Sequence, residues 1–406
     1  MQKFDFVEEG TNWPRGKSGK INVTKLDRLS TGCLTENATT AGQAILQAAQ
    51  NVPNADWRTL WSIAARHGLL KLAMPDEFGG LGASASQCVK TMMAFGREVT
   101  DNGLTLGLNS HIWTVQQPLI TFGTDAQKSN YLSDLMSGQK IGAYALTEEH
   151  SGSDAMALQT SAKKVDGGYI LNGAKTFVGM GPCFDIALVF ASTAPERKAW
   201  GVSVFVVHKD DKGISHGPAQ SKLGLKTLPM GPVEFNNCFI LETRRLGPEG
   251  AGAQIFQTTL DWERAFILSS HVGAMTRQVE DCAHFAKTRE TFGKPILEHQ
   301  SVSNRLADMA LRAETARLIL LSAAERYDAG SLSPEMAAMT NLHISEGFLA
   351  SSLDAVRNFG GKGYLDGSQA GADFTDALGG VIYSGTSDVQ RQIIARMTAQ
   401  RQGDHQ

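Results

Sequence analysis

Residues 144–154, with the sequence Tyr-Ala-Leu-Thr-Glu-Glu-His-Ser-Gly-Ser-Asp, lie where the pattern of the chain changes. Before them, apolar residues recur at helical spacing, for example at Trp57, Leu60 and Trp61. After them, short β-branched runs are separated by turn signals such as the Asp-Gly-Gly of residues 166–168. The stretch itself is rich in small and hydroxyl residues, which suits either a capped turn or the approach of a polar ligand to the backbone. We therefore predict that a helical domain gives way here to a β domain.

The helical pattern returns after about residue 250. The strands that we expect are Tyr169–Leu171, Ile186–Phe190, Val202–Val207 and Val233–Ile240, and the later helices are 253–289, 299–328, 333–358 and 386–400. The predicted fold class is α+β and mostly α, with no internal repeat. Its parts are a polar arm (1–30), an N-terminal α-helical domain (31–140), a middle antiparallel β domain (141–250) and a C-terminal four-helix bundle (251–406).

Composition excludes several classes of protein. The 406 residues carry 38 Lys+Arg and 41 Asp+Glu, a net charge of −3, which argues against binding nucleic acid by neutralising phosphates. The five cysteines are scattered without a Cys-x-x-Cys pair, so we expect no disulfide framework and no metal site. No apolar run is long enough to span a bilayer, and the first residues do not resemble a secretory signal. We expect a cytoplasmic protein.

Glu263 is the first residue with a specific chemical implication. On a helix it shares one face with Phe256, Leu260 and Ile267, so its carboxylate interrupts an apolar stripe. Burial raises the pKa of a carboxyl group, which suits a general base near neutral pH. The alternative is that Glu263 pairs with a cation such as Arg264.

Two glycine-containing stretches form a second candidate site. They are Phe-Gly-Gly-Lys-Gly-Tyr at 359–364 and Ile-Tyr-Ser-Gly-Thr-Ser-Asp at 382–388. Glycine allows a ligand to approach the backbone closely, but it also ends helices. Either interpretation fits these residues taken alone.

Taken together, these motifs resemble the acyl-CoA dehydrogenase family over residues 36–400. The matching stretches occur in the family's order: YALTEEHSGSD (144–154), GGYILNGAKTF (167–177), RETFGKPILEHQ (289–300), FGGKGY (359–364) and YSGTSDVQRQIIAR (383–396). The resemblance implies a cofactor, FAD, bound between the β domain and the C-terminal bundle. It also implies a reaction, the α,β-desaturation of an acyl thioester, in which a carboxylate removes the α-proton and the β-hydrogen leaves as hydride to flavin N5.

The resemblance also assigns site residues. Those implied to line the flavin and its pyrophosphate are Tyr144, Leu146, Thr147, Ser153 and Phe177, and those implied to complete the cofactor site are Gly360, Gly361 and Thr386. Those implied to reach FAD across a subunit interface are Arg289, Thr291, Phe292 and Gln300, so a homodimer or homotetramer is expected. Those expected to contact substrate are Arg264, Ser384 and Gly385.

One departure from the family pattern bears on the catalytic base. Most members carry the catalytic glutamate where this chain has Ser384, and a serine hydroxyl cannot take the α-proton unaided. Members similar to isovaleryl-CoA dehydrogenase carry it earlier, directly before an arginine, and that position is Glu263. The family pattern and the helix face therefore indicate the same residue as the base.

The substrate implied is a thioester held on an acyl or peptidyl carrier protein. The serine at 384, the glutamate at 263 and residues 298–314 look like the prolyl-carrier-protein dehydrogenases of natural-product biosynthesis. Two alternatives stay open: a short or branched-chain acyl-CoA dehydrogenase of catabolism, and an inert thioester-binding relative. The electron acceptor is either an electron-transfer flavoprotein or oxygen, so the enzyme is a dehydrogenase or an oxidase.

Overall fold

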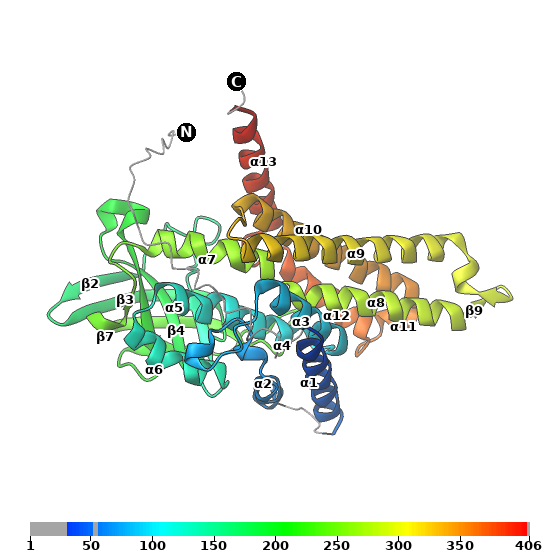
Figure 1. Ribbon diagram of the computed structural model, residues 1–406, viewed down its shortest axis with the longest axis horizontal. Coiled ribbons are helices and arrows are strands. Elements are labelled where there is room, and N and C mark those ends of the chain that lie inside the picture. Colours follow the sequence, from blue (N-terminus) through cyan, green and yellow to red (C-terminus); the bar gives the residue numbers. More distant parts are fainter. Residues whose placement is uncertain (1–30, 52–55, 404–406) are drawn as a thin grey trace.

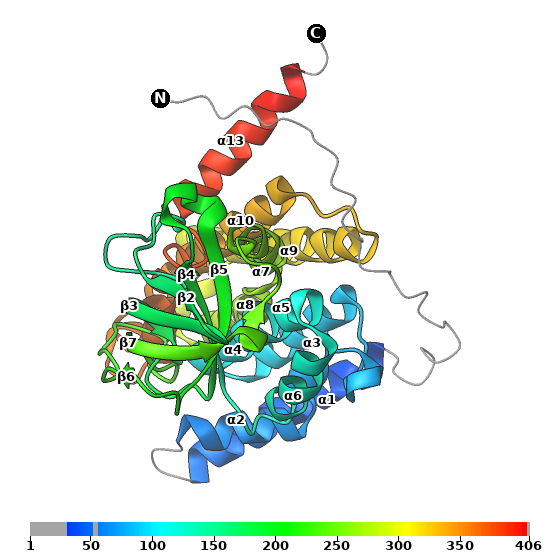
Figure 2. The same ribbon diagram turned by 90° about the vertical axis from the view of Figure 1, so that its left-hand side faces the viewer.

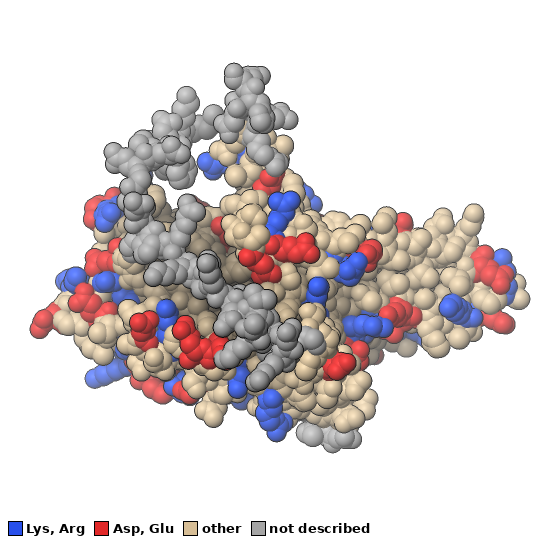
Figure 3. Space-filling model, viewed as in Figure 1, with Lys and Arg blue, Asp and Glu red and all other residues tan. Residues whose placement is uncertain are grey.

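The computed structural model describes residues 31–51 and 56–403. The polar arm predicted for residues 1–30 lies outside the described residues. The β domain forms one end of the molecule, and long C-terminal helices extend to the other end, with the N-terminal helices packed beneath them (Figure 1). Acidic and basic side chains are interspersed over the face shown in Figure 3, as the near balance of charges predicts.

The N-terminal part is helical, as predicted. Its elements are α1 (Thr31–Asn51), α2 (Trp57–Arg66), α3 (Ala85–Glu98), α4 (Asn102–Ser110), the π-helical segment η4 (His111–Gln116), α5 (Gln117–Phe122) and α6 (Asp125–Met136). Capping boxes begin α3 at Ser84 and α6 at Thr124. The sequence did not predict α4, because Gly103 and Gly107 lower its helix propensity. Packing requires Gly103, since a Cβ there would lie 2.4 Å from the Thr227 hydroxyl.

The middle part is one sheet of eight strands. They are β1 (Gly142–Ala145), β2 (Ser161–Val165), β3 (Gly168–Gly179), β4 (Ile186–Ser192), β5 (Val202–His208), β6 (Ile214–His216), β7 (Met230–Leu241) and β8 (Arg245–Leu246). The order is β6-β7-β3-β2-β4-β5-β8, with β1 beside β4. Most pairs are antiparallel, as predicted, but β1 and β2 each run parallel to β4. Neither strand is joined to β4 by a hairpin, since β2 and β3 lie between β1 and β4 in the chain, and β3 lies between β2 and β4. Figure 2 shows this sheet from its own end of the molecule.

The C-terminal part is helical, as predicted. Its elements are α7 (Gly252–Phe266), α8 (Ser269–Thr288), the hairpin β9 (Glu290–Thr291) and β10 (Lys294–Pro295), α9 (Gln300–Asp328), α10 (Pro334–Phe359), α11 (Gly361–Tyr364), α12 (Gln369–Gly380) and α13 (Ser387–Gly403). Helix α10 packs against α7, α8, α9, α12 and α13. The helix predicted at 386–400 exists as α13, but it projects from the body in both views (Figures 1 and 2). The unpredicted α12 packs on α10.

The single helix predicted at 253–289 is wrong, because the chain breaks between α7 and α8. Side chains take the place of backbone donors at this break. The Ser269 hydroxyl donates to the Phe266 carbonyl at 2.6 Å, and the Asn341 amide donates to the Arg264 carbonyl at 3.4 Å. Helical carbonyls that are satisfied in this way allow a helix to end without a glycine. The break leaves Glu263 in the last turn of α7.

A buried polar network ties α4, α8 and α12 together. Arg277 on α8 forms an ion pair with Asp373 on α12 at 3.2 Å, and Asn102 on α4 donates to the same carboxylate at 2.9 Å. Asp376, one turn further along α12, accepts from Asn102 at 3.0 Å. This network holds the N-terminal and C-terminal helices together near the 381–386 loop, which carries Ser384.

Candidate active site

Glu263 lies inside the protein, on the last turn of α7. Its side chain is only 4% exposed. The Ser384 hydroxyl donates a hydrogen bond to Oε1 of Glu263, while Oε2 is buried with no hydrogen-bond partner among the described residues. A buried carboxylate oxygen without a partner is costly unless a ligand supplies one. The carboxyl group therefore has one oxygen held by the protein and one available for chemistry.

The protonation of Glu263 is poised near neutrality. Burial raises the pKa of Glu263 to about 7, against the opposing effects of the Ser384 hydrogen bond and the positive charge of Arg264. A carboxyl group with such a pKa is largely ionised just above neutral pH, and it is a stronger base than an ordinary glutamate. Glu263 therefore has the burial, the free oxygen and the pKa that a general base needs.

Two tyrosine hydroxyls lie near this carboxylate from different parts of the chain. Burial raises the pKa of Tyr144, on β1, and the charge of Glu263 contributes in the same direction. Burial likewise raises the pKa of Tyr383, with further contributions from Asp376 and Glu263, and the Tyr383 hydroxyl has no partner within the described residues. Both phenols therefore stay protonated near neutral pH, and the Tyr383 hydroxyl, which has no partner within the described residues, can donate a hydrogen bond to a ligand.

Arg264, beside Glu263 on α7, lies close to Gly385, the residue after Ser384. The guanidinium of Arg264 is buried, and one of its nitrogens lies 3.8 Å from where a Cβ on Gly385 would stand. Thr386 directly precedes α13, and its hydroxyl accepts a hydrogen bond from the Val389 N–H at 3.3 Å. The structure thus brings the residues predicted at 263–264 and 384–386 together, although about 120 residues separate them along the chain.

The predicted flavin residues of the β domain also come together. The Thr176 N–H donates to the Thr147 carbonyl at 2.9 Å, which places Phe177 beside the loop that follows β1. Phe177 is 59% exposed and has a left-handed φ of 52°, so its ring is turned outward from the sheet. Leu146 is partly buried in this loop, and Ser153 is exposed further along it. An uncovered aromatic ring beside a hydroxyl-rich loop fits a planar, polar cofactor such as a flavin.

Lys175 and Glu148 support this loop, and the sequence reasoning missed their role. The Lys175 ammonium donates to Glu148 at 2.7 Å and to the Leu146 carbonyl at 3.0 Å. Glu148 also accepts from the Gln159 and Thr160 N–H groups. The sequence held a weak signal, because Lys175 is an even number of residues from the buried Tyr169 and Leu171 of β3, although the intervening Gly173 is exposed.

A second set of predicted cofactor residues lies elsewhere in the chain. Its members stand on β9, at the start of α9 and around α11: Arg289, Thr291, Phe292, Gln300, Gly360 and Gly361. This is the end of the helical bundle opposite the β domain (Figure 1). The 20 residues of α8 alone span about 30 Å. One chain therefore does not bring this set to Glu263 and Phe177.

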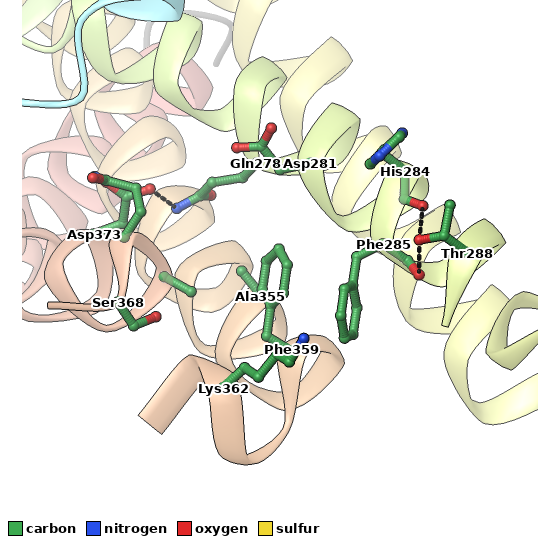
Figure 4. A pocket seen from close by; sticks show the side chains of 12 residues that line it. Gln278, Asp281, His284, Phe285, Thr288, Ala355, Phe359, Lys362, Ser368 and Asp373 are labelled. Carbon is green, nitrogen blue, oxygen red and sulfur yellow. Dashed lines mark hydrogen bonds between the residues drawn. The ribbon is translucent and has the colours of Figure 1, made fainter. Parts of the chain in front are cut away.

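A cavity of about 480 Å³ lies between α8, α10, α11 and α12, and it extends from Asp373 toward this end of the bundle. Phe285 and Thr288 of α8 line one wall, and Phe359 and Lys362 line another (Figure 4). The Lys362 ammonium lies 5.6 Å from the centre of the Phe285 ring. No residue of the Glu263 site lines this cavity.

Three family models match the chain in order. They are the N-terminal domain (residues 35–139), the middle domain (143–238) and the C-terminal domain (250–398) of acyl-CoA dehydrogenase. The chain belongs to the acyl-CoA dehydrogenase family, so the predicted family, fold class and oxidoreductase class are confirmed.

Three similar proteins point to a more specific resemblance within this family. An L-prolyl-(peptidyl-carrier protein) dehydrogenase of Pseudomonas fluorescens is 43% identical over 337 residues, which are 83% of this chain and 89% of that protein. The structure of PigA with FAD and proline is 34% identical with a TM-score of 0.88, covering 92% of this chain and 99% of that one. The prolyl acyl carrier protein oxidase AnaB is 33% identical with a TM-score of 0.86, covering 91% and 98%.

Proposed function

We propose that this protein is an FAD-dependent enzyme that dehydrogenates an aminoacyl thioester, with proline as the first candidate, while the substrate is attached to a carrier protein. The observation that carries the proposal is the buried Glu263 carboxylate with its free Oε2. The relatives that act on, or are named for, carrier-bound prolyl substrates support the substrate class. The reaction belongs to natural-product biosynthesis in this proposal.

The roles of the residues follow from their positions. Oε2 of Glu263 takes the α-proton of the thioester, which the adjacent carbonyl acidifies. FAD, when bound, accepts the β-hydrogen with its electron pair. Phe177, Leu146 and Thr147 hold the flavin from the β domain, and Ser153 serves its pyrophosphate. Arg264 and Gly385 line the substrate side.

A second copy of the chain completes the cofactor site. Arg289, Phe292 and Gln300 lie at the opposite end of the bundle from Phe177, so they reach the FAD of a partner subunit in a homodimer or homotetramer. The ring of Phe292 is 93% exposed, which is unfavourable for an isolated chain and favourable at an interface. We also propose domain limits near residues 140 and 250.

Two finer assignments accompany this proposal. None of the five cysteines, all within the described residues, forms a disulfide, and we propose a cytoplasmic location. Among the described residues, no helix has the length and apolar character needed to cross a membrane.

The electron acceptor is an electron-transfer flavoprotein or oxygen, and oxygen consumption during turnover distinguishes the two.

The proposal is tested by anaerobic reduction of the bound flavin. L-Proline and a small acyl panel are presented both as CoA thioesters and on a phosphopantetheinylated carrier protein. We expect that, of all these substrates, only the prolyl thioester on the carrier protein bleaches the flavin. Bleaching by short branched-chain CoA thioesters instead would identify a catabolic acyl-CoA dehydrogenase.

The variant Glu263→Gln tests the proposed role of Glu263 as the catalytic base. It should bind FAD normally, because the amide keeps the shape of the side chain, and it should lose flavin reduction by at least about 100-fold. If the variant reduces its flavin as fast as the wild type does, Glu263 is not the catalytic base. A folded protein that takes up no FAD would instead indicate an inert thioester-binding relative.

A further inference from the structure

The backbone at Ser384, where most family members carry the catalytic glutamate, has an unusual conformation. Ser384 occupies a left-handed backbone conformation with φ of 61°, and Gly385 follows with φ of 88°. Glycine accepts such angles freely, but a residue with a Cβ does not. Ser384 is therefore held in a strained turn, and strained residues persist only when their surroundings fix them.

Gln390 supplies the fixing contacts. Its side-chain Nε2 donates to the Ser384 carbonyl at 3.0 Å and to the Gly385 carbonyl at 2.9 Å. Gln390 is fully buried in the first turns of α13. Its own N–H donates to the Thr386 carbonyl at 3.0 Å, so the amide side chain is anchored at its base. One buried amide thus closes the turn that presents the Ser384 hydroxyl.

The position of the Ser384 hydroxyl in turn fixes the orientation of the Glu263 carboxylate. Because Ser384 donates to Oε1, the carboxylate cannot rotate freely, and Oε2 is the oxygen left without a partner. A serine hydroxyl does not ionise near neutral pH, so it can orient the base without competing for the proton. An alanine at 384 would lose this hydrogen bond and would keep the backbone strain.

We propose that Ser384 is a positioning residue for Glu263, that Gln390 holds Ser384 in place, and that together they direct Oε2 toward the α-proton. The inference rests on the proposed function. In the proton-transfer step, the Cα–H bond breaks, its proton bonds to Oε2, and its electron pair stays on the substrate. The β-hydrogen then leaves with its own electron pair to the flavin, so the substrate loses two electrons and FAD gains two.

The test compares Ser384→Ala with Ser384→Gly in the FAD-loaded enzyme. Both lose the hydroxyl, but only glycine tolerates the turn without strain. Both should lower the limiting rate of flavin reduction by about 10- to 100-fold, since small misplacements of a reacting group are costly. Both should also raise the apparent pKa of the rate profile, because the hydrogen bond that favours the ionised carboxylate is lost.

A second measurement needs no substrate. Difference infrared spectroscopy follows the protonated carboxyl band of Glu263, which is the band that Glu263→Gln removes. This band should titrate at higher pH in both serine variants. Gln390→Leu should shift it in the same direction, whereas the control Gln392→Leu, at an exposed position of the same helix, should leave it unchanged.

The outcomes separate two failures. If both serine variants keep the wild-type titration and limiting rate, Ser384 does not position Glu263. An effect in alanine but not in glycine would assign the role to backbone strain and would also overturn the proposal. If no thioester reduces the wild-type flavin, the proposed function fails, while the infrared titration still tests the contact between Ser384 and Glu263.

Discussion

The Lys175 ammonium lies 2.7 Å from Oε1 of Glu148, and neither side chain is more than 8% exposed. Burial lowers the pKa of Lys175 to about 8, against the opposing effect of the Glu148 charge. The pair joins β3 to the loop after β1, from which Leu146 and Thr147 are proposed to reach the flavin. An ion pair inside the β domain thus holds in place the loop that is proposed to contact the flavin.

Lys175→Met should destabilise the protein strongly. Removing one partner leaves the Glu148 charge buried and unpaired, which costs about 3–5 kcal/mol. Chemical denaturation should report this loss, and the variant should also release FAD more readily. The control is Lys164→Met on β2 of the same sheet, which breaks exposed pairs with Glu242 and Glu249 and should cost far less. Equal losses in the two variants would contradict a special role for the buried pair.

The rate of flavin reduction should depend on the ionisation of Glu263. Because a base must be ionised to act, the limiting rate should rise about tenfold per pH unit below the pKa of about 7 and level off above it. Rapid-mixing measurements across pH 5.5 to 9, with substrate in excess, check this. A flat profile through this range would show that proton abstraction by Glu263 does not limit the rate.

Glu263→Gln should gain stability relative to wild type as the pH rises. The pKa of Glu263 is about 7 in the folded protein, above its ordinary value of 4.5, so the folded state keeps a proton that the unfolded state releases. The stabilising contribution of this proton is complete below pH 4.5 and is lost as the pH rises through 7. The difference between variant and wild type should therefore grow by about 3 kcal/mol between pH 4.5 and 8. Denaturation curves of both proteins at these two pH values test it, and a constant difference would mean that Glu263 ionises normally.

Phe292→Ser should weaken FAD binding although Phe292 lies far from Glu263. If a partner subunit's FAD rests on this exposed ring, its loss should lower FAD retention about tenfold or more, since an aromatic contact of this kind is worth about 1–3 kcal/mol. Gel filtration with a flavin-to-protein ratio measures both assembly and retention. Leu223→Ser, at a similarly exposed position of the β domain, should change neither. Normal FAD retention by Phe292→Ser would indicate that each chain binds FAD alone.

Several candidate site residues were recognisable before the fold was known, and others were not. Glu263 stood out because an acidic residue interrupted an apolar helical face, and Ser384 stood out against a family pattern. Gln390 gave no such signal, because a glutamine in an amphipathic helix is ordinary. Gln390 is important because the carbonyls of Ser384 and Gly385 both accept hydrogen bonds from its side-chain amide. This geometry depends on the left-handed backbone angles at Ser384 and Gly385.

By itself, the sequence determined the order of helical and β parts, the family and the candidate base, because these depend on local periodicity and on motifs within short stretches. Only the tertiary structure decided that α7 and α8 are separate, that Oε1 of Glu263 is held while Oε2 has no partner among the described residues, and that the two halves of the predicted cofactor set lie at opposite ends of the molecule. These facts depend on contacts between residues more than 70 positions apart, such as Arg264 with Asn341 and Glu263 with Ser384. Such contacts come from packing of whole elements, and packing is a property of the folded chain that no local pattern encodes.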